Sequence, residues 1–559
     1  MPNSWDVIGY SVYFTEIITD GDLAINDLGH YYNIIDTYKN SSAPYQFVWL
    51  EDGGIITKYT CGWTILNAPF LTIGHFVAGW IGYPQDGFST PYQIAIKIAS
   101  FFYVALGLFL SRKILLQFFS DKLTAALLII GVLGTNLLDM SFVGIGLVHG
   151  YLFALYPILI LLTQRFYQTK KTQTAILIGI VLGVMTLTRP TEILAAIIPL
   201  FYGVDSFKSF SIRFKYFFKT PLYLWSIISF ISIYSVQLAY WKYTTDHFLF
   251  FSYKNPGEGL DLDNPHLWNL LFSFRKGWLL YTPIMIFSFI GLYKMYKYHK
   301  ELFWSVGVFF LLNLYVVSSW SNWWYAASFS SRPLVQIYSI CLLLIGFAFY
   351  KMNKGFRIFS AIICSLFIIL NLFQTWQYEN GIIHHERMTS EYYISVFGQT
   401  TPPTPEQQKL LLIERGLPKF ENPEDYNLIQ VLDGGFDKFI LSQDVPHSPH
   451  KRFAYKDMTS KDHLWIILTA DVHKTLPDSI YELNPVTLHL CGSLMHKGQT
   501  YGWTCDNLMN FEGENTSMRH DFLTPEIRFR SDSVSLGFWL QFGPEIEVSN
   551  LQMEVYEHK

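Results

Sequence analysis

Long apolar runs alternate with short polar loops between residues 93 and 376, and this pattern predicts a bundle of membrane-spanning helices. A spanning helix needs about 20 mostly apolar residues, or somewhat fewer inside a bundle. Ten segments fit: 93–111, 123–139, 147–163, 173–187, 190–204, 221–242, 277–294, 302–320, 333–350 and 357–376. The pair within 173–204 could also form one kinked hairpin, because Thr188-Arg189-Pro190 interrupts it.

Residues 1–92, before the bundle, read as a first loop that contains interfacial helices. The stretch GWTILNAPFLTIGHFVAGWIG (62–82) is apolar enough to span a membrane. Asn67, Pro69 and His75 within it, and the flanking Trp63 and Trp80, favour a helix lying in the interface. Spanning remains the alternative interpretation.

Residues 377–436, after the bundle, read as a linker. TTPPTP (400–405) breaks the chain there, and helical spacing at 406–417 predicts one short helix. Residues 437–559 change to short alternating runs that predict an antiparallel β-sandwich, with strands at 463–473, 485–494, 533–543 and 546–559. Cys491 and Cys505 could form one disulfide if this domain is extracytoplasmic.

Lysine and arginine set the predicted orientation, because cytoplasmic loops carry an excess of both. One set of alternate loops is rich in them: Arg112, Lys113 and Lys122; Arg165, Lys170 and Lys171; Lys208, Arg213, Lys215 and Lys219; Lys294, Lys297 and Lys300; Lys351, Lys354 and Arg357. We therefore expect residues 1–92 and 377–559 on the opposite, extracytoplasmic side. Since no segment near the start would export residues 1–57, we also expect a spanning helix upstream of Met1.

Composition agrees with a membrane protein. Hydrophobic residues make up 51% of the 559 residues and charged residues only 15%, against about 25% charged in a typical soluble domain. The formal net charge of −4 provides no basic field for nucleic acid. Nucleic acid is therefore excluded as a partner, and membrane lipids are expected.

Several ionisable residues fall near the expected outer helix ends, where a lipid headgroup would lie. Cations at that depth can hold a lipid phosphate, and the candidates are Arg332, Arg189, Lys276 and Lys58. His149 and Trp324 are added as substrate-binding candidates, although Trp324 could equally belong to an interfacial aromatic belt. Arg189 has a simpler alternative, which is pairing with Glu192 three residues later.

Carboxylates in the first loop are candidates for a general base toward an acceptor hydroxyl. Asp6 follows Trp5 at the start of an amphipathic stretch. Asp20 and Asp22 have the spacing of a DxD motif and form the runner-up catalytic or metal-binding pair. A divalent metal is possible on this reading, but no residues are assigned as its ligands.

Taken together, several segments resemble the GT-C superfamily of membrane glycosyltransferases. WDVIGYSVYFTEII (5–18) looks like the first outer loop, which holds an acidic catalytic residue in that family. The other segments look like an interfacial helix and outer loops: KYTCGWTILNAPFLTIGHFVAGWIGY (58–83), DGFSTPYQ (86–93), LVHGYLFALYP (147–157), TRPTE (188–192), FRKGWLLYTP (274–283) and WSNWWYAASFSSRP (320–333). The last two predicted strands resemble the closing strands of jelly-roll carbohydrate-binding modules.

The resemblance implies a polytopic enzyme of a bacterial inner membrane, with its active face and C-terminal domain periplasmic. It would transfer a hexose or pentose from a polyprenyl-phosphate-linked donor to a glycan, lipid or protein acceptor, with inversion. The family's first span is absent from this sequence, so the role given to Asp6 depends on the expected upstream helix. No cofactor is implied with certainty.

Two other functions fit the same pattern. A non-catalytic membrane assembly or scaffold protein would use the carbohydrate-binding-like β-domain as its working part. A transporter of lipid-linked sugars would need inverted repeats and a site near the membrane midplane. The sequence shows no convincing internal repeat, and the candidate ionisable residues gather toward one face.

Overall fold

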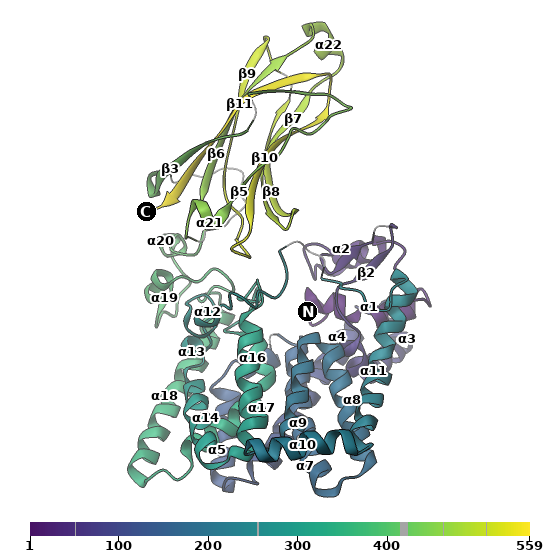
Figure 1. The fold of residues 1–559 in the computed structure, drawn as a ribbon, viewed down its shortest axis with the longest axis vertical. Helices are drawn as coiled ribbons and strands as arrows, with labels where there is room; N and C mark the ends of the chain where they lie inside the picture. Colours follow the sequence, from purple (N-terminus) through teal and green to yellow (C-terminus); the bar gives the residue numbers. More distant parts are fainter. Residues whose placement is uncertain are drawn as a thin grey trace. The chain divides into compact units, whose positions relative to one another are not determined.

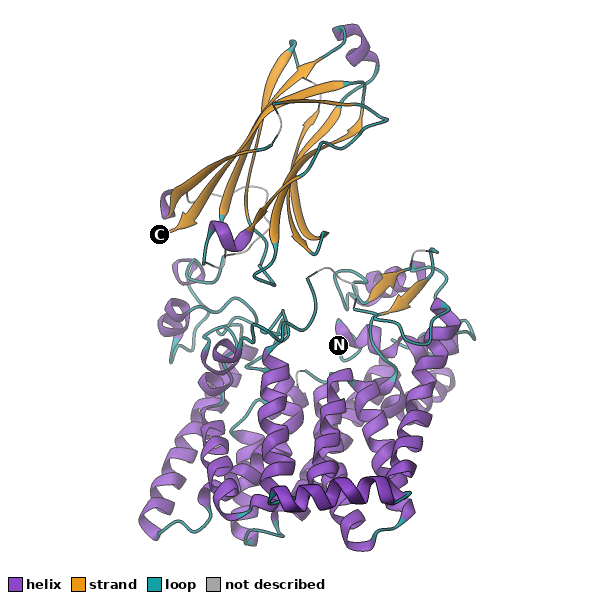
Figure 2. Cartoon of the chain, viewed as in Figure 1, coloured by secondary structure: helices purple, strands orange, loops and turns teal. Residues whose placement is uncertain are grey.

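The computed structural model describes residues 1–50, 52–142, 144–253, 257–413, 423–435, 437–461, 463–509 and 511–559. The chain divides into two compact units. The first, residues 1–254 and 262–411, is mainly helical; the second, residues 255–261 and 412–559, is mainly strands (Figure 1, Figure 2).

Six helices of the first unit are long and apolar enough to cross a membrane, judged by length and composition. They are α3 (Gly62–Ile81), α4 (Thr90–Leu115), α11 (Leu222–Thr245), the run of α15, η3 and α16 (Lys300–Ser318), the run of η4 and α17 (Arg332–Phe349), and α18 (Lys354–Glu379). Two shorter apolar helices are α8 (Thr172–Thr188) and the run of η1 and α9 (Pro190–Phe201). These features indicate a membrane protein.

All ten segments expected to span are helical for most of their length, but three of them are absent from both of these groups. α5 (Asp121–Leu133) stops before Gly134 and is continued by the short α6 (Leu137–Phe142). The segment 277–294 is divided among α13 (Trp278–Tyr281), η2 (Pro283–Met285) and α14 (Ile286–Tyr298), with Pro283 at the break. α7 (Val148–Thr169) is unbroken but carries buried polar residues such as His149 and Gln164.

α3 is a further candidate span, although the sequence favours a position along the membrane interface for this helix. Its first residue, Gly62, lies against Leu187 and Thr188 at the end of α8, and Gly74 lies against Pro91 in the first turn of α4. The Lys and Arg pattern predicts that both of those helix ends lie on the outer side. This agrees with a helix along the interface, which stays a prediction.

The N-terminal segment forms a small lobe of its own. α1 (Asp6–Thr19) and α2 (Gly29–Tyr38) enclose a minor core with the hairpin of β1 (Phe47–Trp49) and β2 (Ile55–Thr57). The unit also contains α10 (Phe207–Lys219) and three shorter helices, which are α12 (Leu267–Phe272), α19 (Ser390–Val396) and α20 (Pro405–Gln408). The helix expected at 406–417 is thus reduced to α20, and residues 414–417 lie outside the described part.

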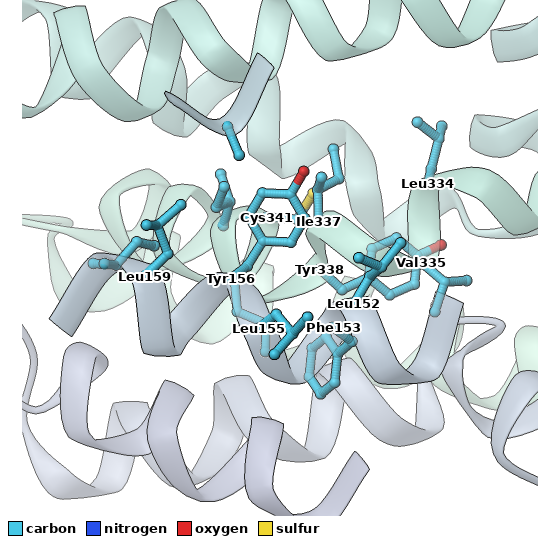
Figure 3. Packing of buried hydrophobic residues seen from close by; sticks show 14 of the residues in the cluster. Leu152, Phe153, Leu155, Tyr156, Leu159, Leu334, Val335, Ile337, Tyr338 and Cys341 are labelled. Atoms are coloured by element: carbon cyan, nitrogen blue, oxygen red, sulfur yellow. The ribbon is translucent and has the colours of Figure 1, made fainter. Parts of the chain in front are cut away.

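The main core of the helical unit joins α7 to the run of η4 and α17. Figure 3 shows side chains of α7, including Leu152, Tyr156 and Leu159, packed among those of the other run, including Leu334 and Tyr338. This packing fixes the two helices that carry His149, Arg332 and Gln336.

The second unit is built from two antiparallel sheets with a shared core. One sheet has the order β5 (Lys451–Ala454), β10 (Ser533–Phe542), β7 (Thr487–His496), β8 (Gln499–Met509). The other has the order β3 (Tyr426–Asp433), β11 (Ile546–His558), β6 (Trp465–Lys474), β9 (Asn515–Leu523), and β4 (Lys438–Leu441) also pairs with β11. Inward residues of both sheets, including Leu468, Leu490 and Phe538, form one hydrophobic cluster.

The four strands expected in this unit are confirmed as β6, β7, β10 and β11. The sheet begins earlier than the expected boundary at 437, because β3 starts at Tyr426; residue 436 itself lies outside the described part. Cys491 and Cys505 face each other across β7 and β8 and form the disulfide, with Cα atoms 4.2 Å apart.

Candidate active site

Asp6 is the first residue of α1, where unpaired backbone N–H groups favour a negative charge. Trp5 precedes the helix with a positive φ of 51°, a sparsely populated conformation that costs a non-glycine residue on the order of 1–3 kcal/mol. Two hydrogen bonds hold it: Trp5 N donates to Asn40 O at 3.1 Å, and Gln46 Nε2 donates to Trp5 O at 2.7 Å. The start of α1, and with it the position of Asp6, is therefore fixed by the rest of the lobe.

Two tyrosines from either side of the β1–β2 hairpin hold one oxygen of this carboxylate. The hydroxyls of Tyr45 and Tyr59 both donate to Asp6 Oδ1, each at 2.8 Å. Gly9 permits the close approach, because a Cβ at that position would lie 2.5 Å from a ring carbon of Tyr59. Thr57 ties the hairpin to α1 by donating its hydroxyl to Gly9 O at 2.9 Å.

Arg332 takes the other oxygen, although 326 positions separate it from Asp6 in the sequence. Its Nη2 donates to Asp6 Oδ2 at 3.1 Å, and the side chains are only 15% and 18% exposed for Arg332 and Asp6. Arg332 Nε is buried and has no hydrogen-bond partner within the described part of the chain. The guanidinium therefore has N–H donors to spare, and a phosphate could accept from them.

Opposing influences act on the pKa of Asp6. Burial is the largest, and it favours the neutral acid and raises the pKa. Arg332, the hydroxyls of Tyr59 and Tyr45, and Lys58 together outweigh burial, so the pKa lies below its usual value. Asp6 is consequently an ionised carboxylate near neutral pH.

Lys58 follows β2 and brings a second cation to Asp6. Only 5% of the residue is exposed, and its ammonium lies over the rings of Tyr45, Tyr59 and Tyr253 at 4.9, 5.4 and 6.0 Å from their centroids. Among the residues that the structure describes, no carboxylate lies at ion-pairing distance from this ammonium. We call Asp6, Arg332, Lys58, Tyr45 and Tyr59 the Asp6 cluster.

Arg189 lies behind this cluster in a polar network of its own. It has extended backbone between α8 and η1, as expected of a residue that precedes a proline. Its Nη1 donates to Gln336 Oε1 at 3.3 Å, and His149 Nδ1 lies 3.3 Å from the same oxygen. Gln336 and Tyr156 both donate to Glu192, so Glu192 is linked to Arg189 through Gln336 rather than by a direct ion pair.

Tyr10 lies within electrostatic range of charges from both the Asp6 cluster and the Arg189 network. Burial raises the pKa of its hydroxyl, Asp6 raises it further, and Arg332 and Arg189 lower it. All three charges therefore act on one ring. The region holds three cations, Arg332, Arg189 and Lys58. It also holds the carboxyl groups of Asp6 and Glu192. The excess of positive charge suits an anionic ligand.

Lys276 belongs to a neighbouring cluster and is almost fully buried, with 1% exposed. Its Nζ donates to the backbone oxygens of Ser328 and His385, the latter at 2.5 Å, and lies 3.3 Å from Ser328 Oγ. Burial lowers its pKa well below the usual range, and Arg332 lowers it further. Lys276 thus joins two loops, one of which reaches Arg332 four residues later.

Trp324 lies beside Lys276 and is also covered. The guanidinium of Arg275 stacks 4.0 Å from the ring centroid, and Trp324 Nε1 donates to Glu386 Oε1 at 3.2 Å. Only 8% of Trp324 is exposed. We call Lys276, Arg275, Trp324, Ser328 and Glu386 the Lys276 cluster. The Trp324 ring is covered within it and is not open to a sugar ring.

Asp20 and Asp22 lie away from Asp6. They follow α1, a helix of 14 residues that begins at Asp6, so Asp20 lies about 21 Å along the helix axis from Asp6. Asp22 accepts from the backbone N–H groups of Leu23 and Ala24 and from the hydroxyl of Tyr243. The Leu23 N–H is the main reason that the pKa of Asp22 is lowered. Among the residues that the structure describes, no group of three His, Cys, Asp or Glu side chains is suited to hold a metal.

Sequence reasoning selected the charges of the site but missed the groups that orient them. Tyr45 and Tyr59 gave no signal, because their partner Asp6 is distant in sequence. Gln336 gave one: it is a polar residue one helical turn after Arg332 in an otherwise apolar run.

No known protein family, curated protein or solved structure matches the chain.

Proposed function

We propose that the protein is a membrane glycosyltransferase that transfers a sugar from a polyprenyl-phosphate-linked donor to an acceptor hydroxyl, with inversion. One observation carries the proposal. The partly buried carboxylate of Asp6 is paired with Arg332 and held by two tyrosine hydroxyls, with the buried cation of Lys58 nearby. A base and a phosphate-binding group thus occupy one place, as this reaction requires.

Asp6 acts as the general base in the proposed reaction. It takes the proton of the acceptor hydroxyl while the acceptor oxygen forms a bond to the anomeric carbon. The bond from that carbon to the phosphate oxygen breaks, and its electron pair leaves with the polyprenyl phosphate. Arg332, Lys58 and Arg189 stabilise the charge that develops on the phosphate.

The ion pair between Asp6 and Arg332 also suggests how the donor prepares the base. A lipid phosphate that draws the guanidinium away from Asp6 Oδ2 exposes that oxygen to the acceptor. Tyr45 and Tyr59 keep hold of Oδ1 meanwhile, so the carboxylate keeps its orientation. Removing Arg332 from the carboxylate also makes Asp6 a stronger base, because the pKa rises once Arg332 no longer opposes the effect of burial.

The test compares Asp6→Asn with Asp20→Asn, a matched change at the residue that follows the end of α1, about 21 Å along the helix axis from Asp6. Each variant is reconstituted with a panel of polyprenyl-phosphate hexoses and pentoses and a cell-envelope extract as acceptor, and release of polyprenyl phosphate is measured. We expect Asp6→Asn to lose about 10³-fold in rate and Asp20→Asn to retain activity. The reverse result would move the site to Asp20 and Asp22, and full activity of both variants would refute the proposal.

A further inference from the structure

α10 has the features of a surface helix at the opposite end of the helical unit. It precedes α11, whose far end meets the N-terminal lobe where Tyr243 donates to Asp22. α11 has 24 residues, or about 36 Å of helix. Figure 1 and Figure 2 show α10 running across the ends of the long helices rather than along them.

The sequence defines where this helix starts and attaches it to the bundle. Ser206 and Ser209 form a reciprocal capping box at its start. Arg213 then anchors the helix: its Nη2 donates to Tyr202 O at 2.7 Å, and its guanidinium stacks 3.8 Å from the ring centroid of Tyr167. One face of α10 is therefore committed to the bundle.

A second face is a row of phenylalanines. Phe207, Phe210 and Phe214 follow the i, i+3, i+7 spacing of one helix face, with successive ring centroids 6.3 and 6.2 Å apart. Phe207 is 85% exposed and Phe214 57% exposed. Water is a poor environment for so much exposed aromatic surface, whereas the acyl region of a membrane suits it.

A third face is basic. Lys208, Lys215 and Lys219 are exposed and share one side of the helix. No acidic residue occurs between 207 and 219; Asp205, the nearest in sequence, precedes the helix at the end away from Lys215 and Lys219. Lys170 adds charge nearby, since its ammonium lies 5.4 Å from the ring centroid of Tyr216.

From these three faces we infer that α10 is a binding site for anionic phospholipids. Its phenylalanine row enters the acyl region, and Lys208, Lys215 and Lys219 contact headgroup phosphates of the leaflet at that end of the bundle. An apolar stripe beside a basic stripe is the arrangement of helices that lie in a membrane interface. Charge complementarity selects anionic lipid, because each lysine near such a surface strengthens its attraction to negatively charged headgroups.

The test is native mass spectrometry of the full, delipidated chain in detergent, titrated with dioleoylphosphatidylglycerol or dioleoylphosphatidylcholine. We expect the wild type to bind the anionic lipid at least about tenfold more tightly. The variant K208Q/K215Q/K219Q should lose that preference. The matched control K297Q/K351Q/K354Q removes three exposed lysines from other turns of the same unit and should keep it.

Further measurements keep the inference falsifiable. If the triple variant fails to fold, Lys215→Gln alone should weaken binding by about fivefold. The variant F207S/F214S should weaken both lipids equally. Equal loss in the control, unchanged binding by the folded lysine variants, or displacement of the lipid by soluble glycerol phosphate would overturn a lipid site at α10.

Discussion

The Asp6 cluster and the Lys276 cluster both bury a cation beside aromatic rings, but they use it differently. Lys276 gives its Nζ donors to the backbone oxygens of two loops, so it has the bonding of a structural clasp. Arg332 makes one hydrogen bond to Asp6 and keeps a buried Nε without a partner among the described residues. The Lys58 ammonium lies over three tyrosine rings. A cation with unused hydrogen-bond donors suggests a ligand-binding site, whereas a cation whose donors are all used suggests a structural role.

The largest effect that would test this contrast is expected from Arg332→Gln. If Arg332 stabilises the leaving phosphate, its loss should lower kcat/KM by about 10³-fold. The pKa of Asp6 should also rise, because burial is then less opposed. Since the base must be ionised, the acidic limb of the pH–rate profile should move to higher pH. A profile that keeps its position would show that Arg332 does not act on Asp6.

The same contrast predicts opposite outcomes for two identical lysine changes. Lys276→Met leaves backbone oxygens of Ser328 and His385 without their buried donor, so we expect a loss of about 2–3 kcal/mol in unfolding free energy. Lys58→Met should cost under about 1 kcal/mol, because methionine keeps the contacts with the rings and loses mainly cation–π attraction. It should instead weaken undecaprenyl phosphate binding by about tenfold.

Thermal unfolding in detergent and binding of undecaprenyl phosphate measure the two effects separately. Lys276→Met, where it folds, should bind undecaprenyl phosphate with near wild-type affinity. If both variants lost binding alike, or stability alike, the division into a ligand site and a clasp would be wrong.

The sequence could predict elements whose signal is local. The apolar runs and the alternation in 463–473 or 546–559 depend on near neighbours, and these segments are helices and strands as expected. The candidate charged residues can also be identified from the sequence, because ionisable residues at the ends of apolar runs are rare and cost free energy to bury. Arg189 was conspicuous for this reason, and Pro190 explains its extended backbone.

The pairings were not predictable, because they depend on tertiary packing. Nothing local joins Arg332 to Asp6, or Gln336 to Glu192, across 326 and 144 positions. In the sequence, Lys276 resembles a phosphate ligand because it is a cation placed where water is scarce. The same property allows it to join two loops as a structural clasp. Only the backbone oxygens around it distinguish the two roles.

The two carboxyl groups of α1 provide a smaller test. Burial raises the pKa of Glu16 from 4.5 to about 7, despite a hydrogen bond from Tyr31, whereas that of Asp6 is lowered. The folded state therefore holds a proton on Glu16 that the unfolded state has lost above pH 4.5. Stability should fall as pH rises from about 4.5 to about 7, by on the order of 2 kcal/mol after allowance for solvent screening.

Glu16→Gln should remove that dependence while leaving the acidic limb of activity unchanged. The measurement is the unfolding midpoint of both proteins from about pH 4 to about pH 8, in steps of about half a unit, which spans the range between the unfolded and folded pKa values of Glu16. Equal slopes for the variant and the wild type would mean that Glu16 is ionised throughout.

The smallest expected effects come from Tyr45→Phe and Tyr59→Phe, and they test how the base is oriented. Each change removes one of two hydroxyls that donate to Asp6 Oδ1, so each should lower kcat/KM by only about fivefold, the worth of a hydrogen bond of about 1 kcal/mol. The double variant should lose more than the product of the two, because the buried oxygen then has neither hydroxyl donor and bears the full cost of desolvation. Strict additivity would mean that the hydroxyls act independently of the shared oxygen. A double variant with normal kcat/KM would show that Asp6 needs no fixed orientation, which would argue against its role as the base.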